Sequence, residues 1–497
     1  MWNQSRQLIL PVFIALIFFA FTFSYFPFRE KLQFDTDEGL NLMRSMLVAL
    51  GYPLYSEVSS DQPPLFTDIL ALLFRVGGPD VYRARLLILL FSTLLVWSGA
   101  QFLQLTSGKL AAILFLPLMI MVPRYLNLSV AVMIGVPSIA LAVASMLFVT
   151  LWHQKRNNLW LILSAFLLVL SVLTKLFTAF VAPIFLAGIT ISEYLKRRNE
   201  NLSWRILQPA LIWSASFTGL GAFLGMSMVG IKNSWLIIFP PLAAPSQDVF
   251  QTGYFSINWH LQAAIPLLIL GLLGGVITLY RRKWMMLYPL AWAILAYTML
   301  SFYSPVFYHH QLLITIPMAM IAAAGVGEGI SFLLTLRQPS EIVRFQTGLG
   351  IVALLGFIWV FPIYGRMLDK ELLNSPSIDG SELQATAGKL KILNMMNEHI
   401  DQTHWIVTDV PMFAFRVARP VPPVLATFSS KRLATGSLTE EDILKTMREY
   451  KPEQVLMARF QIPALEEYLQ ENYTLVLSPE FYRLFLRNDL VPGTKSN

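Results

Sequence analysis

Long hydrophobic runs alternate with short polar segments over the first three quarters of the chain. A helix needs about 20 mostly apolar residues to cross the roughly 30 Å hydrocarbon core of a bilayer. The pattern predicts an α-helical bundle of about eleven transmembrane helices, and the first run is expected to remain as a span because no small-residue cleavage site follows it. The runs, of which the third and fifth are short, lie at 8–28, 86–105, 110–122, 129–151, 159–173, 176–192, 207–230, 261–280, 284–302, 311–335 and 346–364.

The pattern changes near residue 365, where polar and charged residues replace the long apolar runs. Strands alternating with helices indicate a small α/β domain at 366–497, beside a membrane module at 1–365 whose first outer loop covers 29–83. The expected strands lie at 405–408, 454–457 and 473–477, and the expected helices at 382–399 and 463–470. A further helix through about Tyr450 is predicted from the capping-box pattern Ser437-Leu438-Thr439-Glu440.

Composition supports the membrane assignment. Hydrophobic residues make up 55% of the 497 residues and charged residues only 13%, whereas a soluble domain carries about 25% charged residues. This balance excludes a soluble enzyme, a disordered regulator and a fibrous protein. The chain has no cysteine, which excludes disulfides, thiol catalysis and cysteine metal sites.

The basic residues predict the orientation, because cytoplasmic loops are enriched in Lys and Arg. With the N-terminus in the cytoplasm, one set of alternate loops collects nearly all the basic residues. An odd number of spans then places the C-terminal domain outside the cytoplasm. This topology accounts for the net charge of +7, so no nucleic-acid partner is expected. The residues of the basic set are Arg6, Lys109, Lys155, Arg156, Lys196, Arg197, Arg198, Arg281, Arg282, Lys283, Arg337 and Arg344.

The first outer loop is unusually long and holds a cluster of carboxylates. Two apolar stretches in it, Leu40 to Leu50 and Leu65 to Phe74, are too short to span and are expected to lie along the membrane interface. A carboxylate in a partly desolvated cleft can act as a general base. The alternative is a solvated acidic loop or a cation site without catalysis. The carboxylates are Asp35, Asp37, Glu38, Glu57 and Asp61.

The order of several short motifs resembles the GT-C glycosyltransferases. The first loop holds an Asp-Glu pair, then Gly51-Tyr52-Pro53-Leu54-Tyr55 and Asp61-Gln62-Pro63-Pro64-Leu65, and Ala84-Arg85-Leu86 enters the second span. Further along the chain stand Leu173-Thr174-Lys175, Pro305-Val306-Phe307-Tyr308-His309-His310 and Thr408-Asp409-Val410-Pro411. The chain is most similar in this respect to family 39 and its prokaryotic relatives, the protein O-mannosyltransferases and the aminoarabinose transferases.

That resemblance implies an enzyme, a glycosyltransferase of the EC 2.4 class. Such enzymes move a sugar, with inversion, from a polyprenyl phosphate to a hydroxyl, amine or phosphate on a lipid, glycan or protein acceptor at the outer face of the membrane. The base carried over from the family is Asp37, with Glu38 beside it. Asp35 is the second candidate, because Asp35-Thr36-Asp37 leaves the register open. A bacterial cell membrane is expected, since the extra luminal domain of eukaryotic relatives is missing.

Two positions depart from the family pattern. Gln62 stands where many relatives have His or Lys, and Gly135 stands where many have an acidic residue in the fourth span. The second departure puts a second catalytic acid in doubt.

The leaving phosphate gains negative charge, so cations are expected to face it. We expect Lys175 and the pair His309–His310 to hold the phosphate, with Arg85 as a further candidate and Asp61 in the same substrate site. Two adjacent histidines cannot share one helix face, so at most one is expected to face the site, with His310 slightly favoured. The alternative is snorkelling to headgroups or an aromatic belt. Other outer cations are Arg83, Arg124 and Lys232.

No cofactor and no required metal are expected. Asp35-x-Asp37 resembles a metal-binding DxD motif, but a polyprenyl monophosphate has less need of a divalent ion than a nucleotide diphosphate has. Two other classes remain open: a multi-span transporter and a non-catalytic lipid-binding or assembly protein. Transporters usually carry charged or broken helices at the midplane, whereas the acids here lie in the outer loop. The distinguishing feature is whether Asp37 faces a cavity shared with Lys175 and His309.

Overall fold

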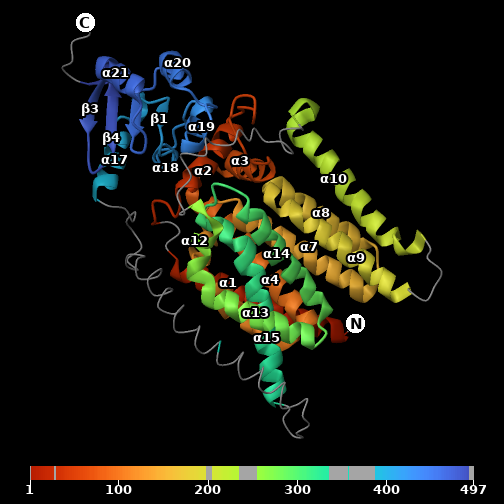
Figure 1. Cartoon of the computed structure of the whole chain (residues 1–497). Helices are drawn as coiled ribbons and strands as arrows, with labels where there is room; N and C mark the ends of the chain where they lie inside the picture. Colours follow the sequence, from red (N-terminus) through yellow and green to blue (C-terminus); the bar gives the residue numbers. More distant parts are fainter. Residues whose placement is uncertain are drawn as a thin grey trace.

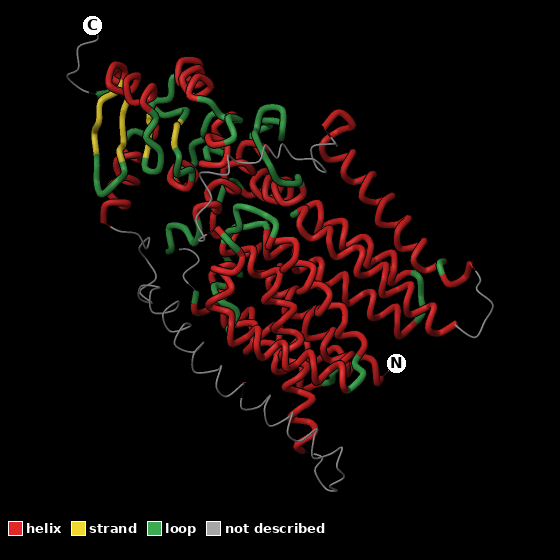
Figure 2. Tube along the Cα trace, in the orientation of Figure 1, coloured by secondary structure: helices red, strands yellow, loops and turns green. Residues whose placement is uncertain are grey.

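A bundle of long helices and a small domain with a four-stranded sheet make up the molecule (Figure 1). The structure is a computed structural model that describes residues 2–26, 30–197, 204–233, 255–334, 356 and 387–491. All strands of the sheet lie in the C-terminal domain, at one end of the bundle (Figure 2). The expected domain boundary near residue 365 lies outside the described residues.

The bundle contains the expected spans. In the described part of the chain, eight helical stretches are long and apolar enough to cross a membrane, and two shorter apolar helices accompany them. They match ten of the eleven predicted runs; the eleventh, 346–364, lies outside the described residues. The chain is therefore a multi-pass membrane protein. The helices are α1 (Trp2–Tyr25), α4 (Val81–Thr106), α5 (Lys109–Ile120), α7 (Gly135–Lys155), α8 (Leu159–Thr174), α9 (Val181–Arg197), α10 (Gln208–Asn233), α13 (Ile265–Tyr280), α14 (Leu287–Ser301) and α15 (Leu312–Leu334).

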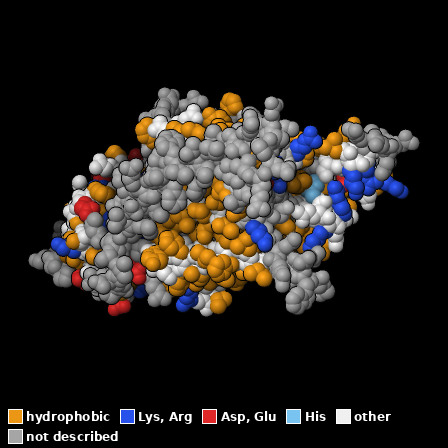
Figure 3. Space-filling model, turned by 90° about the horizontal axis from the view of Figure 1, so that it is seen from below, with side chains coloured by type: hydrophobic (Ala, Val, Ile, Leu, Met, Phe, Trp, Pro, Cys, Tyr) orange, Lys and Arg blue, Asp and Glu red, His pale blue; other side chains and the backbone are white. Residues whose placement is uncertain are grey.

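Burial distinguishes inner from outer helices. The apolar stretch that includes α15 is 94% buried, whereas that of α10 is only 6% buried. Helix α15 packs closely on α13 because Gly325 meets the backbone of Gly274, where a Cβ would come within 2.2 Å of the Cα. Hydrophobic side chains gather over the middle of the face shown in Figure 3. Such a surface needs lipid around it.

The first outer segment forms two helices, α2 (Thr36–Ala49) and α3 (Leu65–Gly77). All residues of α2 from Glu38 to Val48 are buried. This stretch therefore does not present an apolar face to lipid, as a helix lying in the membrane interface would. Its apolar side chains form one core with α3, the start of α4 and the C-terminal domain, so α2 is covered by protein on all sides.

The C-terminal domain confirms the predicted α/β class. The strands β1 (Ile406–Thr408), β2 (Gln454–Met457), β3 (Tyr473–Leu477) and β4 (Arg483–Arg487) form a sheet in the order β1-β2-β4-β3. Only β1 and β2 are parallel, and β4 is a strand that the sequence patterns did not predict. The helices are α17 (Ala387–Glu398), α18 (Met412–Arg416), α19 (Ser430–Ala434), α20 (Glu440–Tyr450) and α21 (Pro463–Asn472).

Helix α20 begins as predicted but with a different cap. Thr439 is the N-cap: its hydroxyl accepts a hydrogen bond from Asp442 N at 3.1 Å, and the Asp442 carboxylate accepts one from Thr439 N at 2.9 Å. The capping box therefore starts two residues after Ser437. The Ser437 hydroxyl bonds to Thr435 at 3.0 Å instead, so it is not available to the helix.

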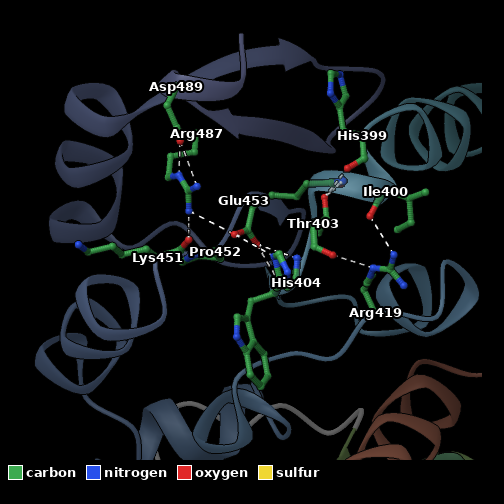
Figure 4. A network of polar contacts seen from close by, with 12 residues as sticks. His399, Ile400, Thr403, His404, Arg419, Lys451, Pro452, Glu453, Arg487 and Asp489 are labelled. Carbon is green, nitrogen blue, oxygen red and sulfur yellow. Dashed lines mark hydrogen bonds and ion pairs between the residues drawn. The ribbon is translucent and has the colours of Figure 1, made fainter. Parts of the chain in front are cut away.

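A polar network fixes the segment before β1 against the ends of β2 and β4 (Figure 4). The Glu453 carboxylate accepts hydrogen bonds from the backbone N–H groups of His404 at 2.9 Å and Trp405 at 3.0 Å. Arg487 lies 3.4 Å from the same carboxylate. Arg419 donates to two carbonyl oxygens that precede β1, at 2.7 and 2.9 Å. The network stabilises the parallel pair β1–β2.

Helix α18, which follows β1, docks the domain on α2. Gly39 allows this approach: a Cβ there would lie 2.6 Å from the backbone nitrogen of Met412. At the end of α18, Arg416 donates to the carbonyl oxygens of Lys31 at 2.7 Å and Leu32 at 3.0 Å. The carboxyl ends of β1 and β2 are thereby held next to the start of α2.

Candidate active site

Two aspartates stand at the start of α2, and their surroundings differ. Asp35 is the N-cap: its Oδ1 accepts from Asp37 N at 2.8 Å, and its Oδ2 accepts from the hydroxyl of Tyr308. Both oxygens of Asp35 are thus engaged. The Asp37 carboxylate is partly exposed and has no hydrogen-bond donor within the described part of the chain.

The electrostatic surroundings of Asp37 suit a base. Burial by the surrounding protein and the charge of Asp35 raise the pKa of Asp37 from its ordinary value to about 6, against the opposing effect of Arg44. A carboxylate with this pKa is ionised at neutral pH and is more basic than an ordinary aspartate.

Glu38 and Arg85 form a closed pair behind this site, with both side chains fully buried. Arg85 donates to the Glu38 carboxylate from Nε at 2.8 Å and from Nη2 at 2.9 Å. The same carboxylate accepts from the backbone N–H of Phe34 at 2.9 Å and of Val132 at 3.2 Å. Four donors saturate Glu38, and the pair ties the start of α2 to α4 and to the segment before α7.

Lys175 lies where the chain breaks between α8 and the 3-10 helix η1 (Leu176–Phe180), and its backbone is extended. The residue is only 7% exposed. Its Nζ lies 5.5 Å from the ring centroid of Phe177, and within the described residues it forms no ion pair or hydrogen bond. The charges of Asp37 and Asp61 act on it, so Lys175 is within electrostatic reach of the two carboxylates.

The two histidines lie in the 3-10 helix η7 (Tyr308–Gln311). His310 is buried at 6% exposure, whereas His309 is half-buried. The His310 Nδ1 accepts from the backbone N–H of Phe307 at 3.0 Å, so a neutral ring carries its proton on Nε2. The His310 ring lies 5.2 Å from the ring of Phe177, the same ring that contacts Lys175.

Asp61 joins the first outer segment to the C-terminal domain. It lies 3.2 Å from the Nζ of Lys431, in α19, and 3.9 Å from Arg44, in α2. Burial acts to raise the pKa of Asp61, but Lys431 and Arg44 hold it below its ordinary value. A hydrogen bond of 2.8 Å from Thr427 to the carbonyl oxygen of Ser59 strengthens the junction.

The structure thus brings Asp35, Asp37, Lys175 and the histidine pair together. It places Asp61 at the edge of the site, and Glu38 with Arg85 behind it. Of the other outer cations, Arg124 lies 4.3 Å over the ring of Tyr308, Arg83 pairs with Asp80 at 3.4 Å, and Lys232 is exposed at the end of α10.

Several residues of the site were not predicted from the sequence. Arg44 had a usable signal, because it follows Asp37 by seven positions and therefore shares its helix face. Tyr308 belongs to the motif at 305–310, but no role was predicted for it. Lys431 comes from the C-terminal domain, and no local pattern connects it to the first loop.

No obvious metal centre accompanies the site. Among the residues that the structure describes, no group of three or more His, Asp or Glu side chains could hold a metal ion.

Comparison with solved structures identifies the fold: it is similar to that of a solved ArnT and of an archaeal oligosaccharyltransferase. ArnT from Cupriavidus metallidurans bound to undecaprenyl phosphate matches with a TM-score of 0.59 and 14% identity, over 98% of this chain and 99% of that chain. The apo state of that ArnT gives 0.58 and 13%, over 97% and 98%. The archaeal oligosaccharyltransferase AglB from Archaeoglobus fulgidus, in complex with an inhibitory peptide and a dolichol-phosphate, gives 0.55 and 12%, over 92% and 69%.

These likenesses establish the fold over nearly the whole chain, including the C-terminal domain. No protein-family model and no curated protein sequence matches the chain.

Proposed function

We propose that this chain is a membrane glycosyltransferase that moves a sugar from a polyprenyl phosphate to an acceptor hydroxyl, amine or phosphate, with inversion and with Asp37 as the base. One observation carries the proposal. Within the described residues, the Asp37 carboxylate and the buried Lys175 have no ion-pair partner, the charge of Asp37 acts on Lys175, and His310 can donate from Nε2. A base next to an anion site is what transfer from a sugar phosphate requires.

In the proposed reaction, Asp37 accepts the proton of the acceptor group as that group attacks the anomeric carbon. The new bond forms on one face of the sugar while the bond from the anomeric carbon to the phosphate oxygen breaks on the other. This single displacement inverts the anomeric configuration. Lys175 and the Nε2–H of His310 stabilise the negative charge that grows on the departing phosphate. Protonated Asp37 then releases its proton to solvent.

The kind of donor is supported by the neighbouring structures. ArnT was solved with undecaprenyl phosphate and AglB with a dolichol-phosphate. Both ligands are polyprenyl phosphates, whose tail needs an apolar environment that a lipid-exposed bundle supplies. We therefore propose a polyprenyl-phosphate sugar as donor, and a lipid, glycan or protein as acceptor.

The direct test is sugar transfer by the purified protein. Polyprenyl-phosphate sugars with a radiolabelled sugar would be offered one at a time together with membrane lipid extract, and the label would be followed into new products. We expect wild-type protein to transfer the radiolabelled sugar from one of the donors to a new product. If no donor loses its label to any product, a transporter or a lipid-binding protein becomes the better assignment.

The orientation is proposed from the loop charges: N-terminus in the cytoplasm and C-terminal domain outside, in a bacterial cell membrane. A reporter that is active only in the cytoplasm, fused after Asn497, is expected to stay silent. The same reporter fused after Lys155, in a loop of the basic set, is the positive control. A strong signal from the first fusion would contradict the orientation.

The raised pKa of Asp37 predicts a pH dependence. A base must be ionised, so kcat/KM is expected to fall about tenfold per pH unit below about pH 6 and to level off above it. Asp35→Asn removes the neighbouring charge that raises the pKa, and Asn caps helices about as well as Asp. In this variant, the decrease of kcat/KM at acid pH should begin at a lower pH than in wild type. A wild-type limb near the ordinary aspartate value of about 4 would argue against Asp37.

Lys175→Ala is expected to weaken donor use by about ten- to a hundredfold, because a charge-assisted hydrogen bond is worth roughly 1.5–3 kcal/mol. The KM for the polyprenyl donor should rise, and thermal unfolding should change little, because Lys175 has no ion-pair partner to lose. The matched control is Lys109→Ala, an exposed lysine at the start of α5. An unchanged KM in the Lys175 variant would remove this residue from the phosphate site.

A further inference from the structure

The loop after β2 is held rigidly by one buried carboxylate. Asp409 is fully buried and follows β1 directly. It accepts hydrogen bonds from three successive backbone N–H groups: Ala458 at 2.9 Å, Arg459 at 2.7 Å and Phe460 at 2.8 Å. Because β1 and β2 are parallel, Asp409 and this loop lie side by side at the carboxyl ends of the two strands.

The side chain of Arg459 contacts an aromatic ring and has no acidic partner among the described residues. Its guanidinium lies 5.0 Å from the ring centroid of Phe460, and that ring stacks on Phe428 at 5.4 Å. Arg459 is exposed, and within the described residues its guanidinium forms no ion pair and no hydrogen bond. The Asp409 carboxylate beside this loop accepts hydrogen bonds from backbone N–H groups and forms no ion pair with Arg459.

The loop lies next to the proposed base. Asp409 stands three residues before Met412, whose backbone packs on Gly39, two residues after Asp37. The charge of Arg459 accordingly acts on Asp37 and lowers its pKa. Lys175 from the bundle and Arg459 from the C-terminal domain, neither of which has an ion-pair partner among the described residues, therefore both interact electrostatically with Asp37.

The two cations come from different parts of the molecule, Lys175 from the helical bundle and Arg459 from the C-terminal domain. A polyprenyl donor is anchored in the bilayer by its tail, so its phosphate belongs on the bundle side, with Lys175. The acceptor must reach Asp37 from the side that the donor leaves open, where the C-terminal domain covers α2. A planar guanidinium is well suited to bind an oxyanion through two hydrogen bonds.

We propose that Arg459 binds an oxyanion of the acceptor, phosphate or carboxylate, and that Asp409 is the positioning residue that orients it. This inference rests on the proposed function, because it takes Asp37 as the centre of the reaction and Lys175 as the donor side. It assigns to the C-terminal domain a direct part in acceptor recognition.

The test uses the full chain in nanodiscs, with excess undecaprenyl phosphate to fill the donor side. Methyl phosphate and acetate are the probes, and binding of methyl phosphate is followed by phosphorus NMR line broadening, with acetate as a competitor. Wild-type protein is expected to bind methyl phosphate, and Arg459→Gln is expected to weaken binding about tenfold or more. Arg448→Gln removes an exposed arginine of the same domain, in α20, and should leave binding unchanged.

Asp409→Asn tests the positioning role. It should weaken methyl phosphate binding, and the double variant with Arg459→Gln should bind no more weakly than Arg459→Gln alone, because Asp409 acts only through the arginine. If Asp409 is purely structural, Asp409→Asn should lower the unfolding temperature, and the double variant should bind methyl phosphate more weakly than Arg459→Gln alone. This result would overturn the positioning role.

Three further outcomes would overturn the acceptor assignment. They are wild-type protein that binds no methyl phosphate, Arg459→Gln protein that binds it as wild type does, and Arg459→Gln protein that loses undecaprenyl phosphate instead. The binding assay needs no sugar donor. Sugar transfer by wild type with unchanged methyl phosphate binding in Arg459→Gln therefore rejects this inference alone, whereas failed transfer with Arg459-dependent binding rejects the proposed function.

Discussion

Asp37→Asn is expected to reduce sugar transfer by about a hundredfold or more, since general-base catalysis contributes about 10²–10⁴-fold. Asparagine keeps the size of the side chain and removes its basicity. The loss should appear in kcat, with little change in the KM for the donor, because Lys175 and His310 are untouched. The substitution removes a carboxylate that burial and Asp35 disfavour in its charged form, so the folded protein should be at least as stable as wild type.

Asp35→Asn is the matched control for this prediction. It changes the same kind of side chain two positions away, and it keeps the capping of α2. We expect this variant to retain most of its activity. Full activity in Asp37→Asn together with an inactive Asp35→Asn would show that the base is Asp35, and full activity in both would remove general-base catalysis from this loop.

Glu38→Gln should cost stability and leave the chemistry of each folded molecule intact. Removing one partner from a buried ion pair leaves the other charge uncompensated, at a cost of about 3–5 kcal/mol. Here the uncompensated group is the Arg85 guanidinium, which is fully buried. Thermal unfolding in detergent measures the loss of stability. The sugar-transfer activity per folded molecule then shows whether Glu38 only positions the site or takes part in catalysis.

The double variant Glu38→Gln with Arg85→Gln provides the control. Removal of both charges should restore part of the lost stability, since no single charge then remains buried. A stable Glu38→Gln protein that no longer transfers sugar would contradict the positioning role and return Glu38 to the catalytic group.

The helices were predictable because the bilayer sets their length. The ten predicted runs within the described residues correspond to apolar helices, and the short runs at 110–122 and 159–173 are indeed the short helices α5 and α8. The strand β4 escaped prediction because its apolar residues pack on both sides within a charged setting, between Arg483 and Arg487.

The helix and the carboxylates of the first outer loop were predictable from the sequence, but the packing of this loop in the folded protein was not. Its helical spacing indicated α2, yet the burial of α2 depends on α18, which lies far along the chain. The register of the two aspartates had a local signal that was not used. Asp35 and Glu38 have the spacing of an N-cap and its third helical residue, and this assigns Asp35 to capping and leaves Asp37 unoccupied.

Arg416 and Arg85 both donate to the carbonyl oxygens of Lys31 and Leu32, and this shared contact has a consequence for biosynthesis. Arg416 follows Lys31 by 385 residues. A ribosome that adds about 5–20 residues per second needs roughly 20–80 s to synthesise that interval. Throughout this time α2 has already been synthesised, while α18, which covers it, has not yet been made.

During that interval the apolar side chains of α2 lack their cover, and the start of α2 lacks one of its two arginine contacts. In the proposed orientation, we therefore expect the nascent chain to depend on chaperones outside the cytoplasm until α18 has been translocated. The candidate active site is then completed only after α18 has been made. A ribosome that stalls late in the message would release a membrane-inserted but inactive protein, which quality-control proteases can recognise by the uncovered α2.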